Sequence, residues 1–185
     1  DILVPTANLT ADNVPVSKFM DTVTGMMPAG TAAYEKRGVA ADLPHWDVKN
    51  CMQCNWCASV CPHAVVRPFV MTAEEAEGVA DAVPMKGAKD KKFTLGWSLM
   101  DCTGCGSCAE VCPARNKAIT MAPAEDHFMH AAQAKYDHLY KNVDEKETPF
   151  KESTVKGAQL KTPLMEFSGA CPGCGETPYA KLVTQ

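Results

Sequence analysis

Two copies of one cysteine pattern constrain this chain of 185 residues more than any other feature. Residues 51–62 read CMQCNWCASVCP and residues 102–113 read CTGCGSCAEVCP, so each copy has the spacing C-x2-C-x2-C-x3-C-P. Eight of the ten cysteines lie in these copies, which are offset by 51 residues. Thiolate donors at short, repeated spacings predict a chain that folds around metal.

The spacing indicates two [4Fe-4S] clusters that exchange one ligand, as in bacterial ferredoxins. Three cysteines separated by two residues can converge round one tight loop, whereas the fourth precedes a proline, which favours extended backbone leading away from that loop. We therefore predict that each cluster takes three cysteines from one copy and the fourth from the other. The two ligand sets are Cys51, Cys54, Cys57 and Cys112, and Cys102, Cys105, Cys108 and Cys61.

Structural zinc is the alternative, because each copy also offers four thiolates. Zinc ribbons use two C-x2-C pairs separated by a longer loop, so three cysteines in series favour iron–sulfur clusters. Disulfides are disfavoured, since the sequence shows no secretory signal. Trp56 and Trp97 are candidates for screening the clusters from water, and ordinary core packing explains them equally well.

Composition restricts the partners and the compartment. A formal net charge of −4 gives no sign of nucleic-acid binding, and no apolar run approaches the length of a membrane-spanning helix. Cysteine pairs without a secretory signal predict a soluble, cytoplasmic protein. The first residue is Asp1 rather than Met, which suggests a piece of a longer polypeptide or a processed product.

The segments around the two motifs predict strands. Residues 45–50 and 93–99 lead into the motifs, and residues 64–66 and 118–121 follow them. Phe93, Leu95, Trp97 and Leu99 alternate with smaller or polar residues, as in a β-strand. The expected unit is strand, ligand loop, strand, used twice.

Two helices are predicted outside the motifs. Thr72 and Glu75 form a capping-box pattern that opens an inserted helix to Val83, before Pro84. A basic loop follows, which fits a solvated loop better than a docking patch for an acidic electron carrier. Its residues are Lys86, Lys89, Lys91 and Lys92.

The second helix is predicted from Pro123 to Lys141. One face would carry apolar residues, and the histidines are expected to form a polar face rather than a metal site. The apolar residues are Phe128, Ala132, Tyr136 and Leu139 or Tyr140, and the histidines are His127, His130 and His138.

Residues 1–44 and 142–166 contain prolines and glycines without sustained periodicity, which predicts an irregular arm and an extended connector. The connector leads to a third motif, in which Cys171 and Cys174 form a single C-x2-C pair. Alone this pair suits half of a metal site or a redox dithiol. Thr177 and Pro178 follow as a predicted N-cap and first residue of a helix.

The chain resembles the 2-oxoacid:ferredoxin oxidoreductase family, in particular its pyruvate:ferredoxin and pyruvate:flavodoxin oxidoreductases, over nearly its whole length. The resemblance is carried by motifs in the arm, both cysteine copies, the connector and the third motif. They are VPVS at 14–17, AAYEKRGVA at 32–40, NCMQCNWCASVCPHA at 50–64, DCTGCG at 101–106, TPF at 148–150, TVKG at 154–157 and EFSGACPGCGETPY at 166–179.

The resemblance implies the cofactors and partners. Cys171 and Cys174 would be two ligands of a third [4Fe-4S] cluster, completed by residues outside this chain, and Glu176 would contact thiamine diphosphate. The complete enzyme would use thiamine diphosphate and Mg²⁺ to convert pyruvate and coenzyme A to acetyl-CoA and CO2. Electrons would pass to ferredoxin or flavodoxin. The remainder of the polypeptide, as a homodimer, would complete the enzyme.

The expected fold is α+β. It comprises an irregular arm (1–44), a ferredoxin-like dicluster domain with an inserted helix (45–141), a connector (142–166) and the opening of a thiamine-diphosphate-binding α/β domain (167–185). The expected function is electron relay within the oxidoreductase, and this chain alone should not turn over pyruvate. The alternative is a free-standing dicluster ferredoxin-type carrier, in which the third motif is incidental.

Overall fold

The structure is a computed structural model that describes residues 2–26 and 30–185. The chain divides into two compact units, Asp1–Glu35 and Lys36–Gln185. Both sheets and all ten cysteines belong to the second unit. None of the helices in the described ranges is long and apolar enough to cross a membrane.

The first unit contains short helices, so the predicted irregular arm is wrong in this respect. They are α1 (Leu3–Ala7) and the 3-10 helices η1 (Ala11–Asn13), η2 (Val16–Thr22) and η3 (Thr31–Tyr34). Pro5 is compatible with α1 because it lies in the first turn, where its missing N–H would have had no helical acceptor. Residues 1 and 27–29 of the predicted arm lie outside the described residues.

Two antiparallel sheets connect the repeats. One pairs β1 (Asp42–Trp46) with β5 (Ile119–Pro123), and the other has the order β2-β4-β3, from β2 (Val66–Met71), β4 (Ala88–Trp97) and β3 (Val83–Met85). The strand before each motif therefore pairs with the strand after the other motif. The predicted unit of strand, ligand loop and strand, used twice, is confirmed, although β1 begins earlier than the predicted residues 45–50.

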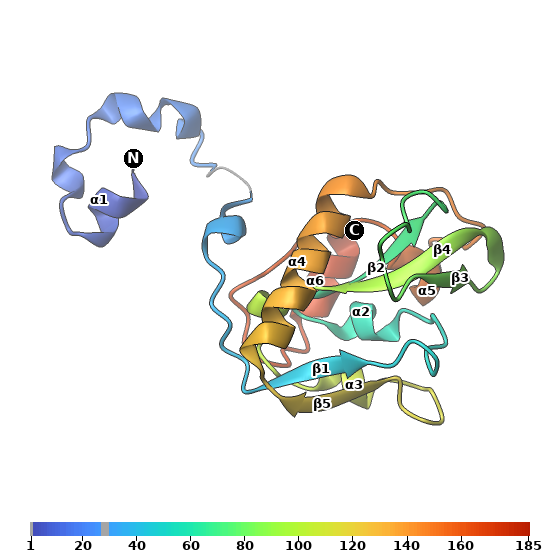
Figure 1. Cartoon of the computed structure of the whole chain (residues 1–185). Helices are drawn as coiled ribbons and strands as arrows, with labels where there is room; N and C mark the ends of the chain where they lie inside the picture. Colours follow the sequence, from blue (N-terminus) through green and yellow to red (C-terminus); the bar gives the residue numbers. More distant parts are fainter. Residues whose placement is uncertain (1, 27–29) are drawn as a thin grey trace. The chain divides into compact units, whose positions relative to one another are not determined.

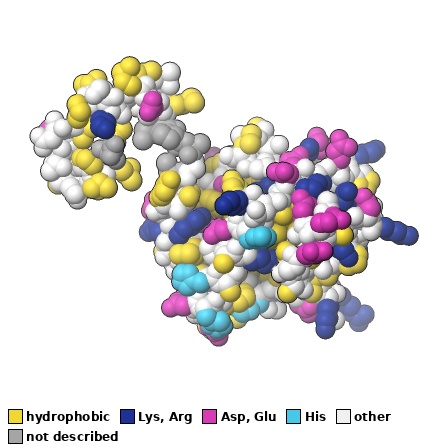
Figure 2. Space-filling model, turned by 45° about the horizontal axis from the view of Figure 1, so that its top comes forward, with side chains coloured by type: hydrophobic (Ala, Val, Ile, Leu, Met, Phe, Trp, Pro, Cys, Tyr) yellow, Lys and Arg dark blue, Asp and Glu magenta, His cyan; other side chains and the backbone are white. Residues whose placement is uncertain are grey.

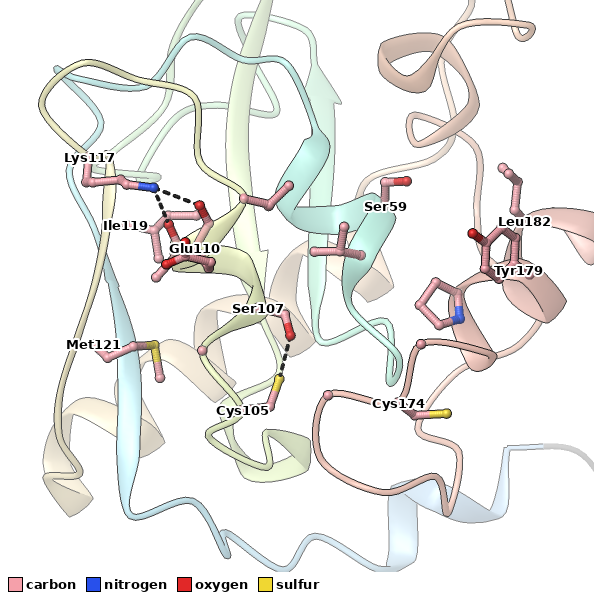
Figure 3. Close-up of a pocket in the computed structure, with 17 residues that line it drawn as sticks. Ser59, Cys105, Ser107, Glu110, Lys117, Ile119, Met121, Cys174, Tyr179 and Leu182 are labelled. Carbon is pink, nitrogen blue, oxygen red and sulfur yellow. Dashed lines mark hydrogen bonds between the residues drawn. The ribbon is translucent and has the colours of Figure 1, made fainter.

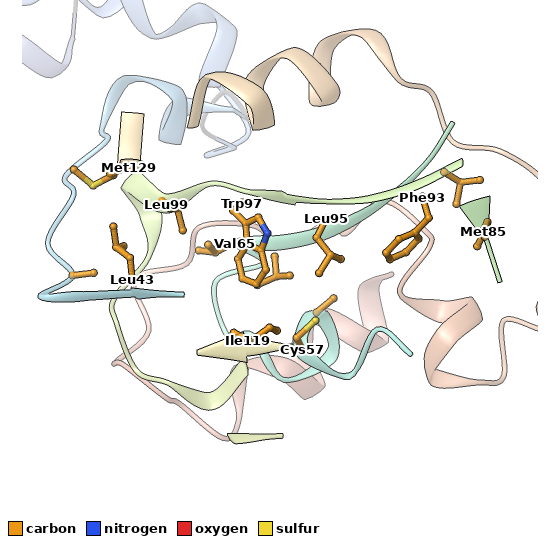
Figure 4. Close-up of a cluster of buried hydrophobic side chains, with 14 of the residues drawn as sticks. Leu43, Cys57, Val65, Met85, Phe93, Leu95, Trp97, Leu99, Ile119 and Met129 are labelled. Carbon is orange, nitrogen blue, oxygen red and sulfur yellow. The ribbon is translucent and has the colours of Figure 1, made fainter. Parts of the chain in front are cut away.

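The core lies between the three-stranded sheet and the ligand helices (Figure 4). Phe93, Leu95 and Trp97 project from β4 into this core, and Cys57 enters it from the ligand loop of the first motif. The intervening Gly96 faces Tyr136 of α4 (Asp126–Asn142). Because both faces of β4 are covered, residues 93–98 are all buried, and the alternation seen in the sequence separates two packed faces.

Helix α4 covers the outer face of the sheet (Figure 1). The predicted apolar face is confirmed, since Tyr136 and Leu139 pack with Phe69 and Met71 of β2. The start was wrong: Pro123 is the last residue of β5, where its ring does not interrupt a helix. The histidines of α4 are exposed, as predicted for a polar face; they are His127, His130 and His138.

The predicted inserted helix is absent from the described residues 72–82, which form successive turns. The capping box itself exists: the Glu75 N–H donates to Thr72 Oγ1 at 3.2 Å, and the Thr72 N–H donates to Glu75 Oε2 at 2.9 Å. Gly78 then takes a left-handed φ of 80°, which ends any helical run. The capping box is therefore predicted correctly, but turns follow it instead of a helix.

The predicted basic loop is a β-hairpin. Lys86 and Gly87 form its tight turn between β3 and β4, with a φ of 92° at Gly87, and the other three lysines lie on β4. Pro84, read as a helix stop, is on the edge strand β3, where the absence of an N–H is tolerated. Figure 2 shows acidic and basic side chains interspersed on one face of the molecule.

The C-terminal part adds two helices. The connector is not wholly extended, because Thr154 caps one helical turn, α5 (Val155–Ala158), by accepting from the Gly157 N–H at 3.1 Å. Helix α6 (Thr177–Thr184) confirms the predicted helix after the third motif. Its N-cap is Glu176 rather than Thr177, so Thr177 and Pro178 both lie in the first turn.

Candidate metal centre

The first cavity is small and lies beneath the core face of β4. Phe93, Leu95 and Ile119 supply apolar walls. Trp46 also lines it, rather than the Trp56 and Trp97 suggested by the sequence. Four cysteines surround this cavity, namely Cys51, Cys54, Cys57 and Cys112.

The second cavity, also small, lies under the loop of the other repeat. Val65, Val66 and Met121 supply apolar walls, and the buried His63 adds a polar one. Four cysteines surround this cavity too, namely Cys61, Cys102, Cys105 and Cys108. Each cavity thus combines three cysteines of one repeat with the fourth of the other.

The fourth cysteines leave their own loops because of the short ligand helices. Helix α2 (Trp56–Val60) carries Cys57 and ends before Cys61, which has extended backbone with ψ 114°. Helix α3 (Ser107–Glu110) carries Cys108 in the equivalent place, with Cys112 two residues beyond its end. Because α2 and α3 pack against each other, each departing chain reaches the neighbouring cavity.

Burial controls the protonation of these thiols. Burial raises the pKa of the Cys57 thiol, and the thiol of Cys108 adds to the rise. Burial raises the pKa of Cys108 to about 12 and that of Cys102 to about 11, with Cys61 contributing to both. These interactions agree with the place of Cys61 in the lining of the second cavity and with the packing of α2, which carries Cys57, against α3, which carries Cys108. Thiols with raised pKa values keep their protons at neutral pH. They become thiolates when a metal binds and displaces those protons.

The donor set suits iron–sulfur clusters, since each cavity offers four sulfur donors and an apolar surround. Among residues 2–26 and 30–185, no group of three or more His, Cys, Asp or Glu side chains is arranged around a point that would hold one metal ion. All ten cysteines are free of disulfide bonds.

The third motif lies against the second cavity. A β-carbon built on Gly173 would be 3.6 Å from the Cβ atom of Cys105 and 3.7 Å from the Oγ atom of Ser107. A groove between α3 and α6 is lined by Cys105 on one side and by Cys174 and Tyr179 on the other (Figure 3). The turn that carries Cys171 and Cys174 therefore belongs to the same side of the molecule as the second cavity.

The surroundings of Cys174 favour the thiolate form of its side chain. The Thr177 hydroxyl donates to Cys174 Sγ at 3.1 Å, and this bond, with the N–H groups at the start of α6, lowers the pKa of the thiol. Cys171 is exposed. Glu176 is exposed at the N-cap of α6, and its side chain makes no capping hydrogen bond.

Three residues near the cavities were missed in the sequence. Asn55 occupies the position equivalent to Gly106, so alignment of the two repeats at the 51-residue offset could have found it. His63 lines the second cavity and its Nε2 atom lies 2.7 Å from the carbonyl oxygen of Ala170, next to Cys171. Lys181, which is 2 % exposed, had no sequence signal.

The chain matches two sequence families. Residues 47–116 match a family described as a 4Fe-4S dicluster domain. Residues 1–40 match the EKR family, described as a domain of unknown function. The α+β fold and the presence of an iron–sulfur dicluster region thus agree with the sequence-based expectation.

Curated relatives match the entire chain. It is 45 % identical over 188 residues to the pyruvate-flavodoxin oxidoreductase of Klebsiella pneumoniae, and 47 % identical over 189 residues to the pyruvate:ferredoxin oxidoreductase of Moorella thermoacetica. The whole chain is similar to one segment of these oxidoreductases. The alignment covers 100 % of this chain and 16 % of each of these relatives. The pyruvate dehydrogenase [NADP(+)] of Cryptosporidium parvum is 40 % identical over 100 % of this chain and 10 % of its own length.

Proposed function

We propose that the chain is the electron-relay segment of a pyruvate:ferredoxin or pyruvate-flavodoxin oxidoreductase. The observation that carries the proposal is the pair of cavities, each lined by four cysteines drawn from both repeats. Similarity of the whole chain to a segment of oxidoreductases of this kind supports it.

On this proposal the two cavities hold the two [4Fe-4S] clusters with the ligand sets predicted from the spacing. The clusters would accept and release single electrons when bound. The chain positions the thiolates on two short helices and surrounds them with buried apolar side chains, which limits access of water and tunes the potential. Cys171 and Cys174 would supply half the ligands of a third cluster, and Glu176 would contact thiamine diphosphate.

The complete enzyme would oxidise pyruvate, with coenzyme A, to acetyl-CoA and CO2. Thiamine diphosphate and Mg²⁺ would serve this reaction in the remainder of the polypeptide, for which residues 167–185 form the opening of a domain. Residues 1–44, 45–141 and 142–166 would be the arm, the dicluster domain and the connector. A cytoplasmic homodimer is the proposed assembly.

The contacts between motifs favour one order of electron transfer. Gly173, in the third motif, lies beside Cys105, so electrons would enter at the second cavity. Cys57 of the first cavity and Cys108 of the second lie on the packed helices α2 and α3, so an electron that enters at the second cavity would have a short path to the first. Short separations of this kind are what single-electron transfer between buried centres requires.

The first cavity has an exposed border suited to an electron acceptor. Met52 lines that cavity and is 53 % exposed, and the neighbouring Trp56 is 45 % exposed. Lys86 Nζ donates to the Cys51 carbonyl oxygen at 2.8 Å, and Lys156 Nζ donates to the Lys86 carbonyl oxygen at 2.8 Å. This apolar surface with a basic edge would suit an acidic ferredoxin or flavodoxin.

Anaerobic production of the chain, followed by iron analysis and EPR spectroscopy, tests the proposal. We expect a brown protein with about eight irons per chain that dithionite bleaches, and EPR signals of two interacting reduced clusters. A colourless protein that binds zinc in place of iron would refute it. The complete polypeptide should carry about twelve irons and oxidise pyruvate, whereas this chain alone should not.

A further inference from the structure

The carbonyl groups at the end of α2 are capped by a lysine from the far end of the chain. Lys181 Nζ donates to the carbonyl oxygen of Ala58 and, at 3.2 Å, to that of Cys61. Lys181 comes from α6, more than a hundred residues later, and its side chain is almost completely buried. An ammonium group at this point satisfies carbonyls that a helix end leaves without intrahelical partners.

The end of α3 has the same arrangement. Lys117 Nζ donates to the carbonyl oxygens of Ala109 at 3.1 Å and Glu110 at 2.7 Å (Figure 3), and to that of Cys112 at 3.0 Å. This lysine follows its own motif closely and is exposed. Each repeat therefore ends in a helix whose carbonyls face one lysine ammonium.

The two lysines bond carbonyl groups at equivalent positions of the two repeats. Ala58 corresponds to Ala109, and Cys61 corresponds to Cys112, at the offset of 51 residues. The position in the first repeat that corresponds to Lys117 is Val66, which is buried in β2 and can supply no charge. The first repeat thus has no lysine at this position. Helix α6 supplies Lys181 to the two equivalent carbonyl groups, those of Ala58 and Cys61.

The cations lie next to cluster ligands. Burial lowers the pKa of the Lys181 ammonium group, and the sulfurs of Cys61, a proposed ligand at the second cavity, and Cys57, a proposed ligand at the first, oppose this shift. Lys117 bonds the carbonyl of Cys112, the fourth cysteine of the first cavity. A reduced cluster carries one more negative charge than its oxidised form, so a nearby cation favours reduction. The effect is larger for a buried cation than for an exposed one, because water and salt screen the latter.

We propose that Lys181 and Lys117 are equivalent positioning residues that raise the reduction potentials of the two clusters, with the larger contribution from Lys181. The inference rests on the proposed function, because it requires clusters in both cavities. It adds a link between α6 and electron transfer: the helix that follows the third motif also supplies the charge that tunes the relay. The cluster in the second cavity should depend most on Lys181, since Lys181 Nζ donates to the carbonyl oxygen of Cys61, a proposed ligand there.

Redox titrations of the anaerobic chain, followed by EPR, test the proposal with three variants. Lys181→Met should move the midpoint potentials to more negative values, enough to change the ratio of reduced to oxidised cluster about three- to tenfold at a fixed potential. Lys181→Arg keeps the charge, so its midpoint potentials should stay close to those of the wild-type chain. Lys117→Met should give a smaller shift in the same direction.

The variants separate charge from packing. If Lys181→Met retains its iron and its midpoints are unchanged, or if Lys181→Arg shifts them as far as Lys181→Met, the proposal is wrong. If Lys181→Met loses iron, the test falls to Lys117→Met, because Lys117 is exposed and its substitution should not disturb packing. Unchanged midpoint potentials in that variant contradict the proposal. A wild-type chain without iron would instead refute the proposed function itself.

Discussion

Gln53 and Gly104 occupy equivalent positions in the two ligand loops and share left-handed backbone, with φ of 57° and 68°. Each backbone N–H donates at 3.4 Å to the sulfur of the cysteine two residues earlier, Cys51 or Cys102. Glycine adopts this conformation without strain, whereas the glutamine is held by its side chain. Its Nε2 donates to the Pro84 carbonyl oxygen at 3.0 Å. The same loop is thus built once with glycine and once with a fixed, buried amide.

Two glycines of the second loop allow a matched test of this geometry. Gly104→Ala would place a β-carbon 3.0 Å from the backbone oxygen of Asp42, whereas a β-carbon at Gly106 would meet Met121 Cγ at 4.0 Å, which is ordinary van der Waals contact. Both have positive φ, so Gly106→Ala should cost about 1–2 kcal/mol from backbone strain alone. Gly104→Ala should cost at least about 1 kcal/mol more. Urea midpoints for loss of cluster absorbance measure the difference, and equal midpoints would show that Asp42 does not restrict the loop.

The exchanged ligand sets make a prediction about pairs of substitutions. Cys51 and Cys112 line one cavity, whereas Cys51 and Cys61 line different ones. Cys51→Ala with Cys112→Ala should therefore damage one cluster and leave about four irons. Cys51→Ala with Cys61→Ala should damage both and leave fewer. Iron analysis and EPR of the two double variants check this.

The reverse result would show that each repeat binds its own cluster. In that case the pair Cys51 and Cys61 would leave one cluster intact, and the pair Cys51 and Cys112 would damage both. Substitution of Cys174 in an otherwise wild-type chain is the control, because it lines neither cavity and both clusters should remain.

Much of the ligand region could be predicted because it is local. Spacing places three thiols on one loop, and the proline after Cys61 or Cys112 directs the fourth away, so the grouping of cysteines around the cavities follows from short-range rules. The strands around the motifs were likewise predictable from alternation. The thiamine-related role of Glu176 rests on resemblance alone and stays a prediction.

The failures come from long-range competition. Thr72 and Glu75 form their capping box, but Gly78 and the pairing of β3 with β4 prevent the helix that the pattern predicts. The contacts of Lys181 could not be recognised from the sequence, because its hydrogen-bond partners are carbonyl groups more than a hundred residues earlier. Such contacts arise from tertiary packing and leave no local pattern.

The Glu75 carboxylate makes stability depend on pH. Burial raises its pKa, but the hydrogen bond from Lys146, 2.8 Å from Nζ to Oε1, and the hydrogen bond from the Thr72 N–H outweigh burial and lower the pKa below its ordinary value. A folded-state pKa below the unfolded value gives stability that is present above the unfolded value and is lost as pH falls through the folded one. Glu75→Gln should therefore lower stability at pH 7 by about 0.5–1 kcal/mol.

The difference from the wild-type chain should vanish in acid, once Glu75 is protonated in both states. Urea denaturation between neutral pH and about pH 3 measures this convergence. Glu77→Gln is the control, because Glu77 is exposed and makes no ion pair within the described chain. A stability deficit of Glu75→Gln that persists unchanged into acid would assign the effect to packing.

The border of the first cavity predicts how the acceptor meets the chain. Lys86 is exposed and bonded to the Cys51 carbonyl, so Lys86→Glu reverses a charge beside the proposed exit for electrons. At low ionic strength, the second-order rate of electron transfer from the dithionite-reduced chain to flavodoxin should fall about three- to tenfold. The difference should shrink as salt screens the charge. Stopped-flow absorbance measures the rates, and iron analysis must show intact clusters. Lys141→Glu, an equal change at the end of α4, should have little effect; an equal loss there would mean that net charge, rather than this surface, governs the encounter.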